Sequence, residues 1–135
     1  EGVNLTGVDL FLANLTEANL AGANLAGVDL IMANLTEANL AGANLAMASL
    51  IDSDLQGANL TGVDLFWANL AGANLAGANL ARAGLIMANL TEANLAGANL
   101  ERVDLEGANL EGAKANENTI WPEGFDLKAA GVIFD

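Results

Sequence analysis

The segment TGVDLFLANLTEANLAGANL, residues 6–25, decides the fold because it places a leucine at every fifth position. The same spacing holds from Leu5 to Leu110 without exception in 22 consecutive positions. A five-residue step advances a helical side chain by about 140°, so a helix would spread the leucines around its whole circumference. In a plain strand, the odd step would send successive leucines to opposite faces. The pattern therefore predicts a coiled β-solenoid, in which the chain turns a corner every five residues and each leucine points to a common axis.

A longer period sets the number of sides. The cassette of residues 6–25 is followed by AGVDLIMANLTEANLAGANL at 26–45, which indicates a turn of twenty residues with four sides. Residues 61–100 repeat residues 6–45 with 34 identities in 40 positions. This offset of 55 residues is not a multiple of 20, so the second copy is expected to lie one side out of phase with the first.

The small-Asn/Asp-Leu repeat resembles the A(D/N)LXX consensus of the pentapeptide repeat proteins over residues 3–113. The resemblance implies an all-β fold, a right-handed quadrilateral parallel β-helix, in which the leucine and the small residue two positions before it point inward. Ala or Val beside Leu would fill such a narrow tube. Ser53 is the only polar residue in the small inward slot within the leucine run. We expect its hydroxyl to bond a nearby carbonyl group.

The sequence divides into a repeat region, residues 1–115, and a capping tail, residues 116–135. After Leu110 the expected central positions are Ala115, Ile120 and Phe125, and the tail is rich in large apolar residues around Pro122. Such a segment can close the exposed core and strand edge at the end of a solenoid. Its TIWPEGFD stretch is similar to the tails of cyanobacterial pentapeptide repeat proteins. The amino end has no equivalent cap, which motivates a hypothesis of end-to-end association there.

The composition argues against an enzyme. The chain has no cysteine, histidine or tyrosine, so most acid-base and nucleophilic arrangements and all Cys-based metal sites are excluded. We expect no catalytic residue, no cofactor and no metal site. Asn or Asp interrupts the apolar residues about every five positions, so we expect no membrane insertion. A soluble protein of the cytoplasm, or of a periplasmic or thylakoid-lumen compartment, fits this composition.

The slots around each leucine have expected structural roles. Twelve of the 15 glycines fall in the slot two after the leucine, which suits tight corners with positive φ. Stacked pairs such as Asp9 with Asp29 could be imagined as calcium ligands, but the calcium-binding β-roll uses a different, nine-residue repeat. We expect instead that the Asn side chains form ladders of bonds along the stack.

Charge is the first outward feature. With 17 acidic and 4 basic residues the net charge is −13, which repels nucleic acid and favours basic partners. We therefore expect no direct nucleic-acid binding. Certain pentapeptide repeat proteins mimic double-stranded DNA and bind DNA gyrase, so a DNA-mimicking gyrase or topoisomerase regulator of the fluoroquinolone-resistance type is the alternative function. Solubility of a leucine-rich chain is the simpler explanation of the charge. We expect the stacked Arg82 and Arg102 to pair with Glu101. The acidic faces carry Glu17, Glu37, Glu101, Glu106 and Glu111.

Apolar outward residues are the second feature, which we call the apolar stripe. Twenty-residue spacing predicts two stacked sets on adjacent sides, which meet around Met47 and Ile51. A large exposed apolar patch usually marks an interface, although outward ladders can also simply stabilise the stack. We predict a non-enzymatic scaffold that binds another protein or itself, as a homodimer through the stripe or through the N-terminal end. The stripe consists of Phe11, Leu12, Ile31, Met32 and Ile51 in one set and Met47, Phe66, Trp67, Ile86 and Met87 in the other.

Overall fold

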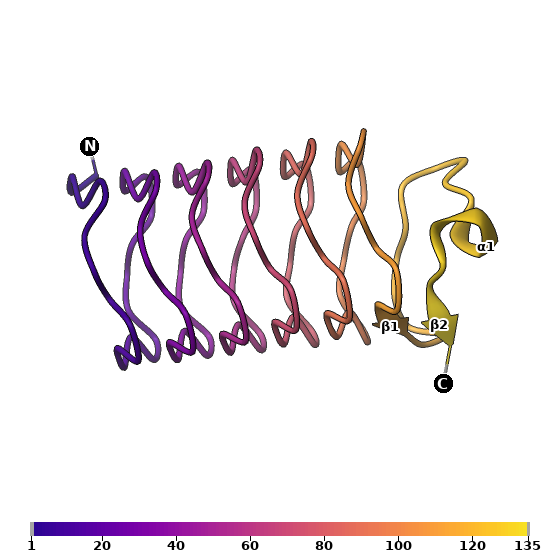
Figure 1. The fold of residues 1–135 in the computed structure, drawn as a ribbon, viewed down its shortest axis with the longest axis horizontal. Coiled ribbons are helices and arrows are strands. Elements are labelled where there is room, and N and C mark those ends of the chain that lie inside the picture. Colours follow the sequence, from indigo (N-terminus) through magenta and orange to yellow (C-terminus); the bar gives the residue numbers. More distant parts are fainter. Residues whose placement is uncertain (1, 135) are drawn as a thin grey trace.

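The computed structural model describes residues 2–134 and shows a rod of stacked coils (Figure 1). Parallel bridges join each residue before a leucine to the residue twenty positions later, from Asn4 with Asn24 to Asn94 with Lys114. One coil therefore takes twenty residues and contains four pentapeptides. The prediction of a solenoid with this period is confirmed.

Three backbone hydrogen bonds per pentapeptide join consecutive coils. Leu25 N–H donates to the Asn44 carbonyl (2.7 Å) and Gly27 N–H donates to the Ala46 carbonyl (2.9 Å). In the other direction, Asn44 N–H donates to the Ala23 carbonyl (2.9 Å). Because this set recurs along the rod, each coil serves as the template for the next.

The corners have a uniform backbone conformation. Each is closed by a bond such as that from Val28 N–H to the Leu25 carbonyl (3.1 Å). The residue two after each leucine has a φ between 56° and 74°, as the third residue of a type II turn requires. Eleven of these positions are glycine, which adopts positive φ readily, and eleven carry a larger side chain.

The leucines and the small residues line the axis as predicted. From Ala23 to Leu100, every residue of these two slots is at most 1% exposed. Ser53 is buried with them, but its Oγ has no hydrogen-bond partner in the described part of the chain. The expectation that this hydroxyl bonds a carbonyl is therefore wrong. The neighbouring carbonyl groups already have backbone partners. The Ser53 carbonyl accepts from Asn74 N–H of the next coil, and the Leu50 carbonyl accepts from Ser53 N–H across the corner.

The Asn and Asp side chains bond within their own corner rather than along the stack. Asn34 Oδ1 accepts from Thr36 N–H (3.0 Å) and from Thr36 Oγ1 (2.6 Å), and the same bond to the N–H two residues later recurs in most repeats. This N–H is the one in each pentapeptide that no backbone carbonyl accepts. Between coils, residues 2–134 contain one bond that joins two of these side chains, from Asn74 Nδ2 to Asp54 Oδ1 (3.4 Å). The expected Asn ladders are therefore wrong, because each corner satisfies its own side chain first.

The few regular elements lie at the carboxyl end. Strand β1 (Lys114–Ala115) pairs in parallel with β2 (Ile133–Phe134), and the short helix α1 (Leu127–Ala130) precedes β2 (Figure 1). Asp126 caps the helix by accepting from Ala129 N–H (3.1 Å), and Gly131 ends it with a φ of 80°. No helix in residues 2–134 is both long and apolar enough to cross a membrane.

The tail leaves the register of the coils by one residue. Asn99 pairs with Ile120, which is 21 rather than 20 positions later. The shift places Thr119 in the small inward slot and Trp121 above Leu100, in the slot of a leucine. Ile120 is consequently 50% exposed, so its expected central position is wrong. Trp121 stacks on Phe125 with ring centroids 5.5 Å apart, and both pack against the core.

Candidate interaction surfaces

The first half of the apolar stripe stacks at one corner of the rod. Leu12 N–H donates to the Ile31 carbonyl (3.1 Å), and Met32 N–H donates to the Ile51 carbonyl (2.9 Å). These bonds place the residues in three consecutive coils. Phe11, Leu12 and Met32 are between 50% and 58% exposed.

The second half stacks at the neighbouring corner. Met47 N–H donates to the Phe66 carbonyl (2.8 Å), and Trp67 N–H donates to the Ile86 carbonyl (3.0 Å). Met87 follows Ile86 at the same corner. Met47 is the most exposed residue of the stripe, at 66%.

A line of polar residues separates the two apolar corners. Bridges join Asp9 to Asp29, Asp29 to Ser49, Ser49 to Asn69 and Asn69 to Asn89, along the side between the corners. Met47 and Ile51 lie at the two ends of this side, with Ser49 between them. The two sets therefore lie on either side of Ser49, and their union into one patch stays a prediction. The stripe consists of two apolar ridges that flank a polar line, because the outward apolar slots are corner positions.

The corner positions with positive φ that are not glycine carry only large apolar or charged side chains. Eleven are not glycine, and five of these hold the large apolar residues of the stripe: Leu12, Met32, Met47, Trp67 and Met87. The other six are all charged: Glu17, Glu37, Asp52, Arg82, Glu92 and Arg102. A bulky side chain in this conformation costs about 1 kcal/mol relative to glycine. The chain thus keeps exposed apolar groups at positions where glycine would be more stable, which favours a functional reason for them.

The acidic residues are exposed at the corners of the rod. Glu17 and Glu37 stack in consecutive coils, because Glu17 N–H donates to the Thr36 carbonyl (2.9 Å). Glu101, Glu106 and Glu111 occupy three successive corners near the carboxyl end, and all three are exposed. They surround the end of the rod on three sides.

The basic residues near these acids do not pair with them. Arg82, Arg102 and Glu101 line a shared cleft of about 260 Å³, yet no ion pair forms among them in the described residues. The predicted pairing with Glu101 is therefore wrong. Exposed ion pairs gain little over separate hydration, so these side chains lie apart. Residues 2–134 also contain no group of three or more acidic side chains that could hold a metal ion.

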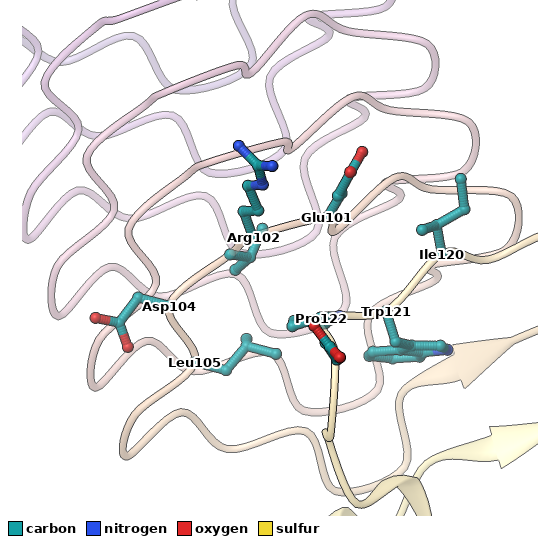
Figure 2. Close-up of a pocket in the computed structure, with 9 residues that line it drawn as sticks. Glu101, Arg102, Asp104, Leu105, Ile120, Trp121 and Pro122 are labelled. Atoms are coloured by element: carbon teal, nitrogen blue, oxygen red, sulfur yellow. The ribbon is translucent and has the colours of Figure 1, made fainter.

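A cleft at the carboxyl end was not predicted from the sequence. It has a volume of about 810 Å³ and lies between the 101–105 segment and residues 120–123 (Figure 2). A second cleft of about 360 Å³ continues it toward Phe125. The indole Nε1 of Trp121 is buried nearby without a partner among the described residues. Pro122 was the only sequence signal, since it stops the chain from continuing as a regular coil.

Comparison with known proteins agrees with this architecture. The profile of the Pentapeptide repeats family matches in eight copies, over residues 1–30, 33–72, 64–88 and 85–117. No curated protein was found to match the chain. Among solved structures, alr5209, a pentapeptide repeat protein from Nostoc PCC 7120, is 41% identical over 72% of this chain and 84% of its own, with a TM-score of 0.40.

Two further solved structures are similar. AT2G44920, a pentapeptide repeat protein from the Arabidopsis thaliana thylakoid lumen, is 32% identical over 71% of this chain, with a TM-score of 0.53. The present chain spans 63% of its length. QnrB1, a plasmid-mediated fluoroquinolone resistance protein, is 19% identical over 94% of this chain and 77% of its own, with a TM-score of 0.42, which carries no functional argument. The family profile and the twenty-residue coils together show that this chain belongs to the pentapeptide repeat proteins.

Proposed function

We propose that this protein is a rigid, non-enzymatic scaffold, a right-handed quadrilateral β-helix that binds another protein through the apolar stripe. The observation that carries the proposal is the set of five exposed apolar side chains at corners with positive φ. Fold stability alone would favour glycine there, as eleven other corners have.

The rod is well suited to present such a surface. Each stripe residue follows a leucine that is fixed in the axis, and backbone bonds to the next coil hold its position. A surface that is already ordered loses little conformational entropy on binding. The ridges therefore form a preorganised contact for a complementary surface.

Charge favours a different protein over a second copy as the partner. The chain has a net charge of −13, and Asp9 and Asp29 lie on the polar line between the ridges. A second copy would bring the same charge to the contact, whereas a partner with apolar groups flanked by Lys or Arg would complement it. We therefore assign the stripe to a partner of that chemistry.

A paired variant tests the proposal. Phe66→Ser with Trp67→Gly removes two apolar groups of the stripe and replaces one strained corner residue by glycine. Arg82→Gly is the matched control, because Arg82 has a φ of 63° at a corner outside the stripe. We would immobilise the parent and both variants and compare the retention of the same partner from extract, at low salt and at about 0.5 M salt.

The expected partner is retained by the parent and by Arg82→Gly, survives high salt, and is lost from the stripe variant. A partner retained equally by all three proteins would contradict the role of the stripe. Analytical sedimentation of the purified parent tests whether a second copy of the chain, rather than another protein, covers the stripe. A concentration-dependent dimer that the stripe variant loses would show that the occupant is a second copy and overturn the assignment to another protein.

The acidic corners support a second candidate, a DNA-mimicking regulator of DNA gyrase or another topoisomerase. Its observation is the net charge of −13 together with the exposed side chains of Glu17, Glu37, Glu101, Glu106 and Glu111. Gyrase supercoiling in rising concentrations of the protein tests it. Inhibition that weakens with salt would support mimicry. No effect at micromolar concentration would exclude it and leave the stripe as the working surface.

A further inference from the structure

The last coil has an open backbone edge along one side. The N–H groups of Arg102, Leu105 and Gly107 and the carbonyl of Val103 have no hydrogen-bond partner within residues 2–134. One coil earlier, every equivalent group is paired. Such an edge is a template on which an additional strand can form.

The equivalent bonds define what the edge would accept. Arg82 N–H donates to the Glu101 carbonyl (2.9 Å), and Leu85 N–H donates to the Asp104 carbonyl (2.8 Å). Met87 N–H donates to the Glu106 carbonyl (2.8 Å), and the Ala83 carbonyl accepts from Asp104 N–H (3.1 Å). A six-residue segment that follows the course of residues 101–106, with a corner at its first two residues and an extended stretch after them, would repeat these four bonds.

The edge is open because the tail detours around it. The chain is in contact with the coil below at Ile120, whose carbonyl accepts from Leu100 N–H (2.7 Å). It then turns away at Pro122 and passes through α1 before Gly131 accepts from Gly112 N–H (3.0 Å). Figure 2 shows the result, with Arg102 to Leu105 on one side of the cleft and Trp121 and Pro122 on the other.

The core is also incomplete beneath this edge. Leu105 is half-buried, whereas Leu85 in the coil below is 0% exposed. An added segment with an apolar side chain in the leucine slot would cover it. The two clefts that border the edge, about 810 and 360 Å³, leave room for a short segment.

The acidic side chains along the edge favour basic residues in the added segment. Glu101 and Glu106 occupy the slot one after the leucine, at the first and last residues of the 101–106 stretch, and both are exposed. Residues in the same slot of consecutive coils stack upon one another. For example, Phe66 lies above Ala46, because Met47 N–H donates to the Phe66 carbonyl (2.8 Å). A segment with Lys in these two slots would place its charges above the two carboxylates. Asp104 and Glu123 add negative charge at the same cleft, and Arg102 is the one basic side chain that lines it.

We propose that this edge binds an extended, basic peptide segment of a partner protein by strand addition, with Lys or Arg above Glu101 and Glu106 and an apolar residue above Leu105. The main-chain bonds would supply affinity, and the side-chain slots would supply specificity. The edge adjoins the end of the apolar stripe, because Met87 N–H donates to the Glu106 carbonyl (2.8 Å). The proposal rests on the open backbone edge and not on the stripe side chains.

A synthetic peptide tests the proposal directly. The probe is acetyl-Lys-Gly-Ala-Asn-Leu-Lys-amide, whose Asn N–H would donate to the Val103 carbonyl. In the free protein, the Leu105 and Gly107 amides are expected to exchange with solvent much faster than those of Leu85 and Met87. Saturating peptide is expected to slow the first two at least tenfold and leave the second two unchanged, as measured by hydrogen exchange and NMR.

Three controls separate strand addition from charge attraction. A peptide methylated on the backbone nitrogen of its Asn cannot donate a hydrogen bond to the Val103 carbonyl and should not bind. Glu101→Gln with Glu106→Gln should weaken binding about three- to tenfold, while Glu17→Gln with Glu37→Gln makes the same charge change at a distant site and should not. The stripe variant Phe66→Ser with Trp67→Gly should bind the peptide like the parent, so failure here is distinguishable from failure of the proposed function.

Three results would overturn the proposal. The first is a Leu105 amide that exchanges as slowly as that of Leu85 in the free protein, because the edge would then already be covered. The second is equal binding of the methylated peptide, and the third is no saturable binding up to millimolar concentration.

Discussion

The rings of Phe66 and Trp67 meet edge to face, with centroids 6.0 Å apart and an interplanar angle of 83°. Both side chains are exposed, by 40% and 52%, so this aromatic contact lies on the surface. It holds Trp67 in a defined orientation at a corner with a φ of 59°. The stripe thus combines backbone strain with side-chain order, as expected of a surface shaped for contact rather than for stability.

Replacement of Met47 by glycine is expected to stabilise the protein by about 1 kcal/mol. Met47 is 66% exposed and has a φ of 63°, so little packing is lost while the backbone strain is relieved. Met47→Ala is the control, because alanine keeps the Cβ atom and hence the strain. Urea denaturation of both variants measures the effect, and equal stability of the two would show that the corner is not strained.

Ser53→Ala is expected to raise the free energy of unfolding by about 1 kcal/mol. The change removes a buried hydroxyl that has no partner among the described residues and keeps the small inward side chain. Ser49→Ala, at an outward position, should change stability by less than about 0.5 kcal/mol. A loss of stability in Ser53→Ala would mean that the hydroxyl is bonded after all.

Thr119→Val is expected to destabilise the tail by about 1.5 to 3 kcal/mol. Thr119 Oγ1 donates to the Leu95 carbonyl (2.9 Å) and accepts from the N–H groups of Asn116 (3.1 Å) and Gly97 (3.2 Å). Valine has the same shape but makes none of these bonds. The fluorescence of Trp121 in a Trp67→Phe background would report release of the tail.

Thr91→Val provides the comparison for this change, since it makes the same chemical replacement at an outward corner. It should leave the stability nearly unchanged. If Thr119→Val were equally neutral, the hydroxyl bonds of Thr119 would contribute nothing to holding the tail, and its backbone bonds and the packing of Trp121 and Phe125 would suffice.

The repeat region could be predicted from the sequence because each of its slots has one strong physical preference. Leucine and the small residue fill the tube, and glycine suits the positive φ of the corner. The prediction for the Asn side chains was wrong because periodicity reveals which residues stack, but not which backbone N–H group lacks a backbone carbonyl as its acceptor. That N–H belongs to the corner, as the bond from Thr36 to Asn34 shows.

The tail could not be predicted in the same way. A single inserted residue between Asn99 and Ile120 exchanges the roles of Ile120 and Trp121, and no repeat marks the place where the register shifts. The open edge at Leu105 follows from that shift and from the detour at Pro122. Both depend on tertiary packing that the repeat pattern does not contain.

The central claim is that the apolar stripe is a binding surface, and the affinity of one retained partner for three proteins tests it most directly. We expect the parent and Arg82→Gly to bind this partner with similar dissociation constants at about 0.5 M salt, and Phe66→Ser with Trp67→Gly to bind at least tenfold more weakly. Equal affinity of all three proteins would contradict the claim and leave the apolar ridges without a role in binding.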